Sequence, residues 1–150
     1  MKTRGFTLIE LAVTLGMLAV LFTLTSFAVL TSIHHADQKS VETTLLSDIH
    51  LQQLKAMQGD TEGQTQAYPY GVYFNANQYT LFRGSTYTSN DPNNYTVIQD
   101  TNFSFSPETS LVFARGSGEI SSPVTFFLTE ANSGVIHSFF VNKYGVVSQN

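Results

Sequence analysis

The sequence predicts an α+β fold, in which a long N-terminal helix packs on an antiparallel β-sheet domain. Three observations support this prediction. An apolar run without any charge fills residues 11–30. Residues 41–57 follow with apolar side chains at helical spacing. From residue 70 onward, apolar and polar residues alternate in short runs that are separated by turn sequences, which is typical of strands.

Composition excludes several kinds of site. The chain has 150 residues, a formal net charge of −4 and no cysteine. This length suffices for one modest domain. The absence of cysteine excludes disulfides, thiolate metal ligands and a cysteine nucleophile. The acidic charge does not favour nucleic acid as a partner, because binding to phosphates needs basic side chains.

Residues 11–30 are long enough to cross a membrane as a helix. At about 1.5 Å per residue they cover roughly 30 Å, the hydrocarbon thickness of a bilayer. Lys2 and Arg4 precede the run and the next basic residue is Lys39, so the positive-inside rule places the N-terminus in the cytoplasm. A buried core helix is one alternative, but it usually has only about 10 to 14 apolar residues. A cleaved secretory signal is another, and residues 32–35 fit its small-residue cleavage site poorly.

A carboxylate lies close to the start of this apolar run. The stretch from Gly5 to Leu11 reads G-F-T-L-I-E-L and follows a short basic leader. Glu10 inside a membrane would cost about 2.5–3.5 kcal/mol on insertion scales. A positive partner would offset that cost, so the sequence predicts a role for Glu10 that involves such a partner.

The G-F-T-L-I-E-L stretch resembles the N-terminus of type IV pilins and type II secretion pseudopilins. The resemblance implies that a prepilin peptidase cuts between Gly5 and Phe6 and N-methylates Phe6. It implies that Glu10 is the assembly residue, paired with the new amine of a neighbouring subunit. The implied partners are other pilin or pseudopilin subunits, the prepilin peptidase, an inner-membrane assembly platform and membrane lipid. No cofactor is implied.

Four parts are predicted along the chain: a leader (1–5), a helix (6–57) with a transmembrane segment at about 11–30, a linker (58–69) and a β-rich head (70–150). In the second half of the helix the predicted buried stripe consists of Val41, Leu45, Leu46, Ile49, Leu54 and Met57. The predicted strands of the head are residues 70–74, 78–82, 95–99, 102–106, 111–115, 124–130, 134–141 and 146–148.

The order of elements in the head looks like that of the H-type minor pseudopilins and the FimT-like minor pilins. The resemblance rests on a hairpin after the helix, the turn F-x-R-G-S-G from Phe113 to Gly118, and a closing strand with G-V-V. Some FimT-like pilins bind DNA through basic residues near the C-terminus. Lys143 is the one such residue in this region, so DNA binding is not carried over.

The polar loop 84–96 is the candidate binding site of the head. Its candidate residues are Tyr87, Asp91, Asn93, Asn94 and Tyr95. The Asp and Asn oxygens could ligate calcium, but the EF-hand pattern is missing and such clusters usually form turns. The tyrosines fit either a contact face for another molecule or packing at the edge of a sheet. No metal site and no catalytic residue is predicted, because the adjacent His34 and His35 point about 100° apart on a helix.

The sequence therefore predicts a non-enzymatic minor pilin or pseudopilin subunit that assembles into a type IV pilus or a type II secretion pseudopilus. Its predicted location is the bacterial inner membrane, with the head outside the cytoplasm, or a periplasmic or extracellular filament. A major pilin or a DNA-uptake pilin is the alternative within the family. A single-pass, membrane-anchored binding or adhesion protein that never assembles is the alternative outside it.

Overall fold

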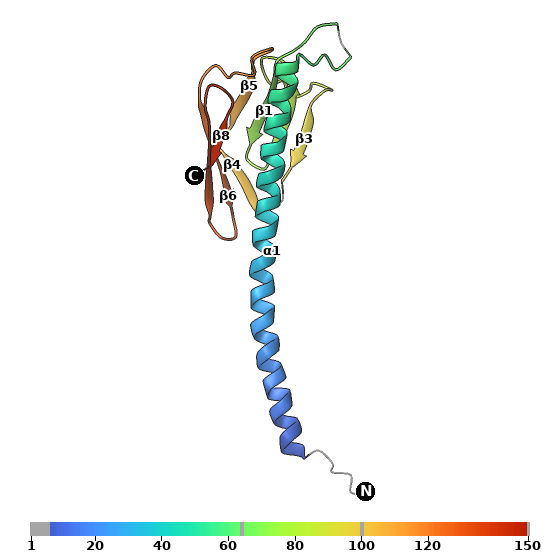
Figure 1. Ribbon diagram of the computed structural model, residues 1–150, viewed down its shortest axis with the longest axis vertical. Helices are drawn as coiled ribbons and strands as arrows, with labels where there is room; N and C mark the ends of the chain where they lie inside the picture. Colours follow the sequence, from blue (N-terminus) through green and yellow to red (C-terminus); the bar gives the residue numbers. More distant parts are fainter. Residues whose placement is uncertain (1–6, 64, 100, 150) are drawn as a thin grey trace. The chain divides into compact units, whose positions relative to one another are not determined.

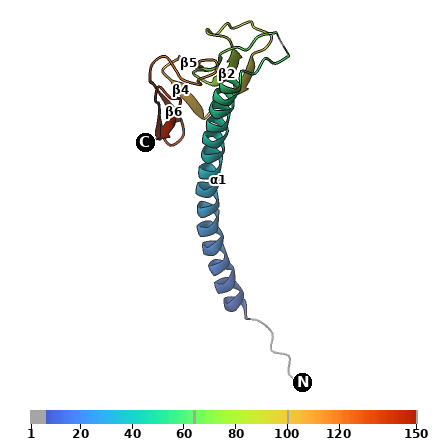
Figure 2. The ribbon, with the colours of Figure 1, turned by 45° about the horizontal axis from the view of Figure 1, so that its top comes forward.

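The computed structural model describes residues 7–63, 65–99 and 101–149, except for the side chains of residues 24–37. Its elements are one long helix, α1 (Leu8–Gln58), and the strands that gather at the C-terminal part of that helix (Figures 1 and 2). The predicted α+β class is confirmed. The strands are β1 (Tyr70–Asn75), β2 (Gln78–Arg83), β3 (Tyr95–Ile98), β4 (Phe103–Ser106), β5 (Thr109–Phe113), β6 (Val124–Glu130), β7 (Ile136–Val141) and β8 (Val147–Gln149).

The chain divides into two compact units, residues 1–40 and 41–150. In the first unit, Thr7 caps the start of α1. The backbone amide of Glu10 donates to Thr7 Oγ1 at 3.3 Å, and the amide of Leu11 donates to the Thr7 carbonyl at 3.2 Å. A threonine followed three residues later by a glutamate is the capping-box pattern. The sequence therefore carries a local signal for where this helix begins.

Between Leu8 and Phe22 the helix is apolar except for Glu10 and Thr14. Every large apolar side chain there is about half exposed or more, from 49% for Val13 to 86% for Leu8. The hydroxyls of Thr14 and Thr23 donate to the carbonyls of Leu11 and Val20, at 2.9 and 2.7 Å, so neither remains an unsatisfied donor. Within the described residues, no helix is both long and apolar enough to cross a membrane.

The second unit contains two four-stranded sheets. The first sheet has the order β3-β2-β1-β5 and the second has the order β4-β6-β7-β8, with every neighbouring pair antiparallel. The hairpin of β1 and β2 closes through Asn75 opposite Gln78. The sequence predicted the strands but not their division between two sheets. The chain changes sheet at three connections, from β3 to β4, from β4 to β5 and from β5 to β6.

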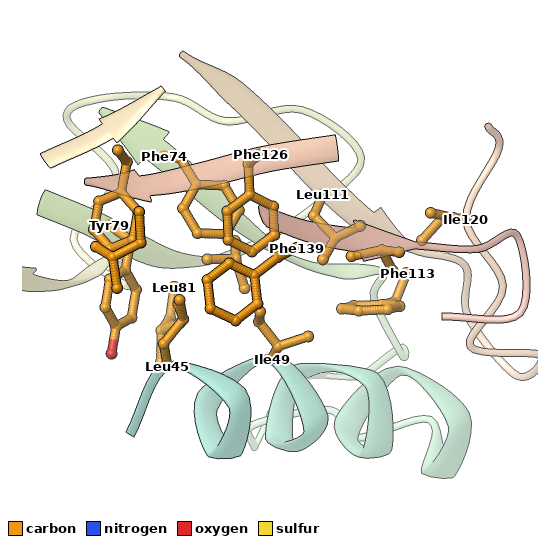
Figure 3. Packing of buried hydrophobic residues seen from close by; sticks show 14 of the residues in the cluster. Leu45, Ile49, Phe74, Tyr79, Leu81, Leu111, Phe113, Ile120, Phe126 and Phe139 are labelled. Atoms are coloured by element: carbon orange, nitrogen blue, oxygen red, sulfur yellow. The ribbon is translucent and has the colours of Figure 1, made fainter. Parts of the chain in front are cut away.

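An aromatic cluster fills the space between the sheets and the helix (Figure 3). Phe74 of the first sheet stacks on Phe126 of the second at 4.3 Å, and Phe126 stacks on Phe139 at 5.1 Å. Leu45 and Ile49 of α1 reach this cluster from the other side and are fully buried. Burial of such side chains contributes about 1.5–3 kcal/mol each, so the second half of α1 is part of the core of the head.

The predicted helix stripe is correct in its first half and wrong in its second half. Leu45 and Ile49 are buried, whereas Leu54 and Met57 are about half exposed. The buried positions instead continue at Gln52 and Ala56, which keep the three-and-four spacing that a helix face requires. The prediction chose the larger apolar residues where the helical period required a glutamine and an alanine.

Two polar side chains of α1 also connect the helix to the end of the chain. Glu42 is almost fully buried, and its Oε1 accepts from Gln149 Nε2 and lies against His137 Nδ1, each at 3.0 Å. Gln53 donates through Nε2 to the carbonyl of Gly118 at 3.1 Å and to that of Tyr144 at 2.8 Å. The helix therefore holds the last strand and two turns of the head through hydrogen bonds.

Candidate assembly and binding sites

The predicted cut site lies outside the described residues, since these begin at Thr7. Glu10, the predicted assembly residue, lies in the first turn of α1 and is exposed. A carboxylate in the first turn is stabilised by the helix dipole by about 0.3–1 kcal/mol. That is well below its cost in a membrane of about 2.5–3.5 kcal/mol, so the dipole alone would not offset insertion.

The large apolar side chains on both sides of Glu10 are exposed in the described part of the first unit. Helices that are apolar on every side are normally buried, either in a protein core or in lipid. The large side chains from Leu8 to Phe22 are exposed instead. An exposed apolar stretch of this kind can be covered by lipid or by other helices.

Tyr87 of the candidate binding loop lies against the first sheet. Its ring stacks on that of Tyr73, with centroids 3.9 Å apart, and meets Phe82 edge-on at 5.6 Å. The Tyr73 hydroxyl donates to Glu108, and this hydrogen bond raises the pKa of Tyr73 to about 12. Tyr87 therefore packs on a face of the first sheet, over the inner strands β1 and β2, and not at a sheet edge as one of the two interpretations from sequence had it.

The acid and amides of the loop satisfy one another rather than facing an open site. Asp91 Oδ1 accepts from the backbone and side-chain nitrogens of Asn93, at 2.8 and 2.6 Å. These two hydrogen bonds lower the pKa of Asp91. Asn94 Nδ2 donates to the carbonyl of Thr88 at 2.7 Å. The geometry is that of a turn closed by an aspartate.

Tyr95, the last candidate residue, starts β3 and is 67% exposed. Together with Asn93 it reaches a groove of about 270 Å³ between the loop and α1. The five candidate loop residues thus form no single site. Asp91 and Asn93 bond to each other in the turn, which Asn94 also helps to close, whereas Tyr87 packs on the sheet. Asn93 and Tyr95 line the groove.

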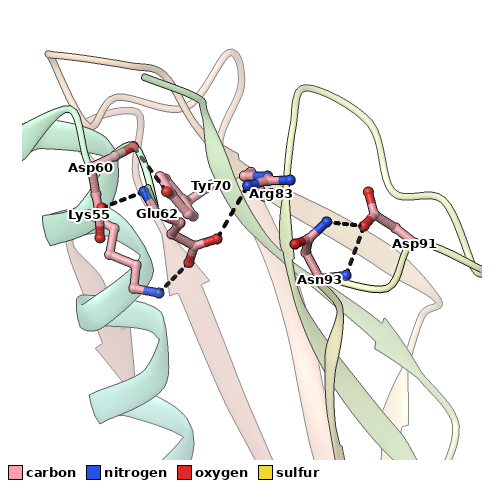
Figure 4. A network of polar contacts seen from close by, with 7 residues as sticks. All are labelled: Lys55, Asp60, Glu62, Tyr70, Arg83, Asp91 and Asn93. Carbon is pink, nitrogen blue, oxygen red and sulfur yellow. Dashed lines mark hydrogen bonds and ion pairs between the residues drawn. The ribbon is translucent and has the colours of Figure 1, made fainter. Parts of the chain in front are cut away.

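A charged network beside this groove was missed from sequence (Figure 4). Glu62 accepts from Lys55 Nζ at 2.7 Å and lies 3.7 Å from Arg83 Nη1. The Tyr70 hydroxyl donates to the carbonyl of Asp60 at 3.0 Å. Burial, with the nearby Glu62 carboxylate, raises the pKa of Tyr70 to about 12. The network ties the segment after α1 to the first hairpin, and no sequence motif marks it.

No group of three or more His, Asp or Glu side chains could hold a metal ion within the described part of the chain. His137 of β7 contacts Glu42 of α1 and Gln149 of β8. It therefore belongs to the polar contact between the helix and these two strands. The side chains of His34 and His35 lie outside the described residues.

Residues 1–26 match the family model of the prokaryotic N-terminal methylation motif. The match supports a subunit of the type IV pilin and pseudopilin family that is processed by prepilin peptidase and anchored in a membrane as its precursor. Proteins with this motif are structural rather than enzymatic. No curated protein and no solved structure matches the chain.

Proposed function

We propose that the chain is a minor pilin or pseudopilin subunit of the H-type or FimT-like kind. It is inserted once in the bacterial inner membrane with the head outside the cytoplasm. Prepilin peptidase cuts it between Gly5 and Phe6 and methylates Phe6. The processed subunit then joins a type IV pilus or a type II secretion pseudopilus. The observation that carries this proposal is the methylation motif over residues 1–26, within which the helix exposes its apolar side chains from Leu8 to Phe22.

The position of Glu10 explains how processing and assembly are coupled in this proposal. Cleavage creates a positively charged amine at Phe6, four residues before the carboxylate. A neighbouring subunit that offers this amine to Glu10 offsets the cost of a carboxylate in the membrane. The cost of Glu10 in the membrane is therefore offset most when a subunit packs in one particular register with its neighbour.

The first test is the intact mass of the protein from sheared filaments and from washed membranes. A chain that lacks residues 1–5 and carries one added methyl group supports the proposal. Finding it in sheared filaments indicates a surface pilus, and finding it in membranes alone indicates a pseudopilus or a rare initiating subunit. An uncut chain in both fractions contradicts the proposal and favours an anchored binding protein.

Two substitutions separate processing from assembly. Gly5→Leu should leave the full-length precursor, because the peptidase has to approach this peptide bond closely. Gly16→Ala is its control, since a methyl group at Gly16 meets no atom within 4 Å. Glu10→Ala should be cut normally and yet enter filaments poorly. Incorporation of Glu10→Ala at the wild-type level would show that the pairing with Phe6 is unnecessary.

A further inference from the structure

The two sheets of the head differ in how their edges are protected. In the second sheet, β8 has only three residues, and short edge strands offer little to another chain. At its other edge, the amide of Phe105 in β4 donates to the carbonyl of Ala76 at 2.7 Å, so the turn between β1 and β2 covers it. Both edges of the second sheet are therefore short or occupied.

Both edges of the first sheet are open. Among the described residues, β5 pairs with β1 alone and β3 pairs with β2 alone. Their sequences, TSLVF and YTVI, contain none of the lysines or prolines that commonly protect an edge. Tyr95 and Ile98 of β3 are 67% and 77% exposed. An unprotected edge with unpaired backbone groups can accept another strand.

A groove lies beside β5. It has a volume of about 570 Å³ and runs between β5 and the segment that leads into β6. Ser110, Leu111 and Val112 line it on the side of β5, and Ser121, Ser122 and Val124 line it on the other side. Glu119 is the one charged residue among its described lining. The groove thus offers room and a nearly uncharged wall along the open edge.

Strand directions make β3 a suitable occupant for this edge. In four consecutive antiparallel strands, the first and the last run in opposite directions. If two copies lie side by side in the same orientation, β3 of one copy is therefore antiparallel to β5 of the other. Register places Thr96 and Ile98 on the same face of the sheet as Ser110 and Val112. The exposed Ile98 would then meet the side of β5 that carries Val112.

We propose that β3 of one copy adds to the open edge of β5 in the next copy, head to tail. The proposal rests on the proposed function, because it describes how heads of the same chain contact one another in a filament. Such a heterologous contact leaves a free β3 and a free β5 at the two ends, so it can repeat without closing.

Pairing of two identical edges is less suitable for this chain. A two-fold axis that pairs β5 with β5 is perpendicular to the sheet and reverses every direction parallel to it. Because residues 41–58 of α1 pack on the face of the sheets, their direction would be reversed as well. Copies whose heads point in the same direction cannot pair in that way, whereas head-to-tail copies can.

One strand pair is a small interface, below the roughly 1,200 Å² of stable complexes. The contact therefore requires copies that are already aligned by their helices in the membrane or the filament, where the effective concentration is high. The test has to use the full chain in cells.

Engineered cysteines test the contact directly, since the natural chain has none. Opposite residues of antiparallel strands have Cα atoms about 4.5–5.5 Å apart, within reach of a disulfide. The chain with Ile98→Cys and Val112→Cys, or with Ile98→Cys and Ser110→Cys for the neighbouring register, should form a ladder of dimers, trimers and larger species on mild oxidation. Chains with a single cysteine at any of these positions should stay monomeric. The matched control combines Ile98→Cys with Thr125→Cys, an exposed position on β6, and should give no ladder.

Each other outcome overturns the proposal. Dimers from Val112→Cys alone would show a two-fold pairing of β5. Thiols that react with maleimide in both double variants but form no ladder would show that the edges do not meet. If the cysteine of Val112→Cys is protected from maleimide and no ladder forms, a different polypeptide covers β5. The intact mass of the same samples separates this result from the proposed function: a cut, methylated chain without a ladder overturns the edge contact alone.

A second variant tests the contact without cysteine. Ile98→Lys places a charge on the edge of β3 at a position that is already exposed, so the head should fold normally. We expect it to reduce incorporation into filaments several-fold, whereas Ile136→Lys, at a similarly exposed apolar position on β7, should not. Equal incorporation of both variants would contradict the proposal.

Discussion

Leu18 and Leu54 lie in the same helix with similar exposed fractions, 55% and 48%, yet their neighbours along the helix differ. Around Leu18 every large apolar side chain is exposed, from Leu8 to Phe22. Around Leu54 the helix alternates between exposed residues and the buried positions Gln52 and Ala56. The comparison teaches that exposure of one leucine says little, whereas apolar exposure on all sides indicates a segment that needs an external partner.

The largest effect is expected in the half of α1 that belongs to the head. Ile49→Ala removes a fully buried side chain next to the aromatic cluster and should lower the free energy of unfolding by about 2–5 kcal/mol. Leu54→Ala is the control and should change it by less than about 0.5 kcal/mol. Urea unfolding of the full chain in detergent, followed by circular dichroism, gives both values. Equal losses would contradict the assignment of only one of these residues to the core.

A charged side chain should lower membrane recovery when it is placed in the first half of α1 and not when it is placed in the second half. Leu18→Lys places a charge in the apolar segment, which costs about 2.5–3.5 kcal/mol on insertion scales, and should lower the amount of chain recovered in the membrane. Leu54→Lys changes a position of similar exposure in the head and should leave membrane recovery unchanged. Recovery is measured by fractionation at equal expression. If the two variants were recovered equally, the segment from Leu8 to Phe22 would not be the one that lipid covers.

Two glycines test the hydrogen bonds between α1 and the turns. Gly145 and Gly134 both have left-handed φ angles, 77° and 68°, so alanine at either should cost about 1–2 kcal/mol. A methyl group at Gly145 would also lie 2.3 Å from Gln53 Nε2 and 2.9 Å from Phe113 Cε1, whereas at Gly134 it meets nothing within 4 Å. Gly145→Ala should therefore be less stable than Gly134→Ala by a further 1–3 kcal/mol or so, measured by the same urea unfolding. Similar losses would show that Gln53 moves aside without cost.

The smallest expected effect is a loss of stability of the head at alkaline pH. The pKa values of Tyr70 and Tyr73 are raised to about 12, above the usual value of about 10. The fold therefore favours the neutral phenols, and this stabilisation is complete below pH 10 and is lost as the pH rises to about 12. Melting temperatures measured between pH 9 and 12 should fall over this range. The melting temperature of the Tyr73→Phe variant should fall less steeply over this range. An unchanged slope would contradict the role of the hydrogen bond to Glu108.

Patterns local in the sequence predicted most of the fold. Alternation predicted each strand to within about two residues, because the strands are short and separated by glycine and asparagine turns. The division into two sheets was not predicted, since it depends on which distant strands pair. The burial of Glu42 was not predicted either, because its partner Gln149 lies at the other end of the chain.

For the sites, the N-terminal motif was readable because its residues are contiguous, and residues 1–26 match the methylation motif. The head was harder to interpret. Tyr87 and Asp91 are neighbours in the loop, yet one stacks on Tyr73 and the other binds Asn93. The ion pairs of Glu62 join the helix end to the first hairpin, and only the folded chain reveals them.

The cap at the start of α1 has a consequence for the helix before and after the predicted cleavage. In the described chain the helix begins at Leu8 under the hydroxyl of Thr7. Thr7 lies after the predicted cut, so the mature chain would retain it when residues 1–5 are removed. The precursor and the product can therefore share one helix start, and a subunit would not have to refold its first turn between maturation and incorporation.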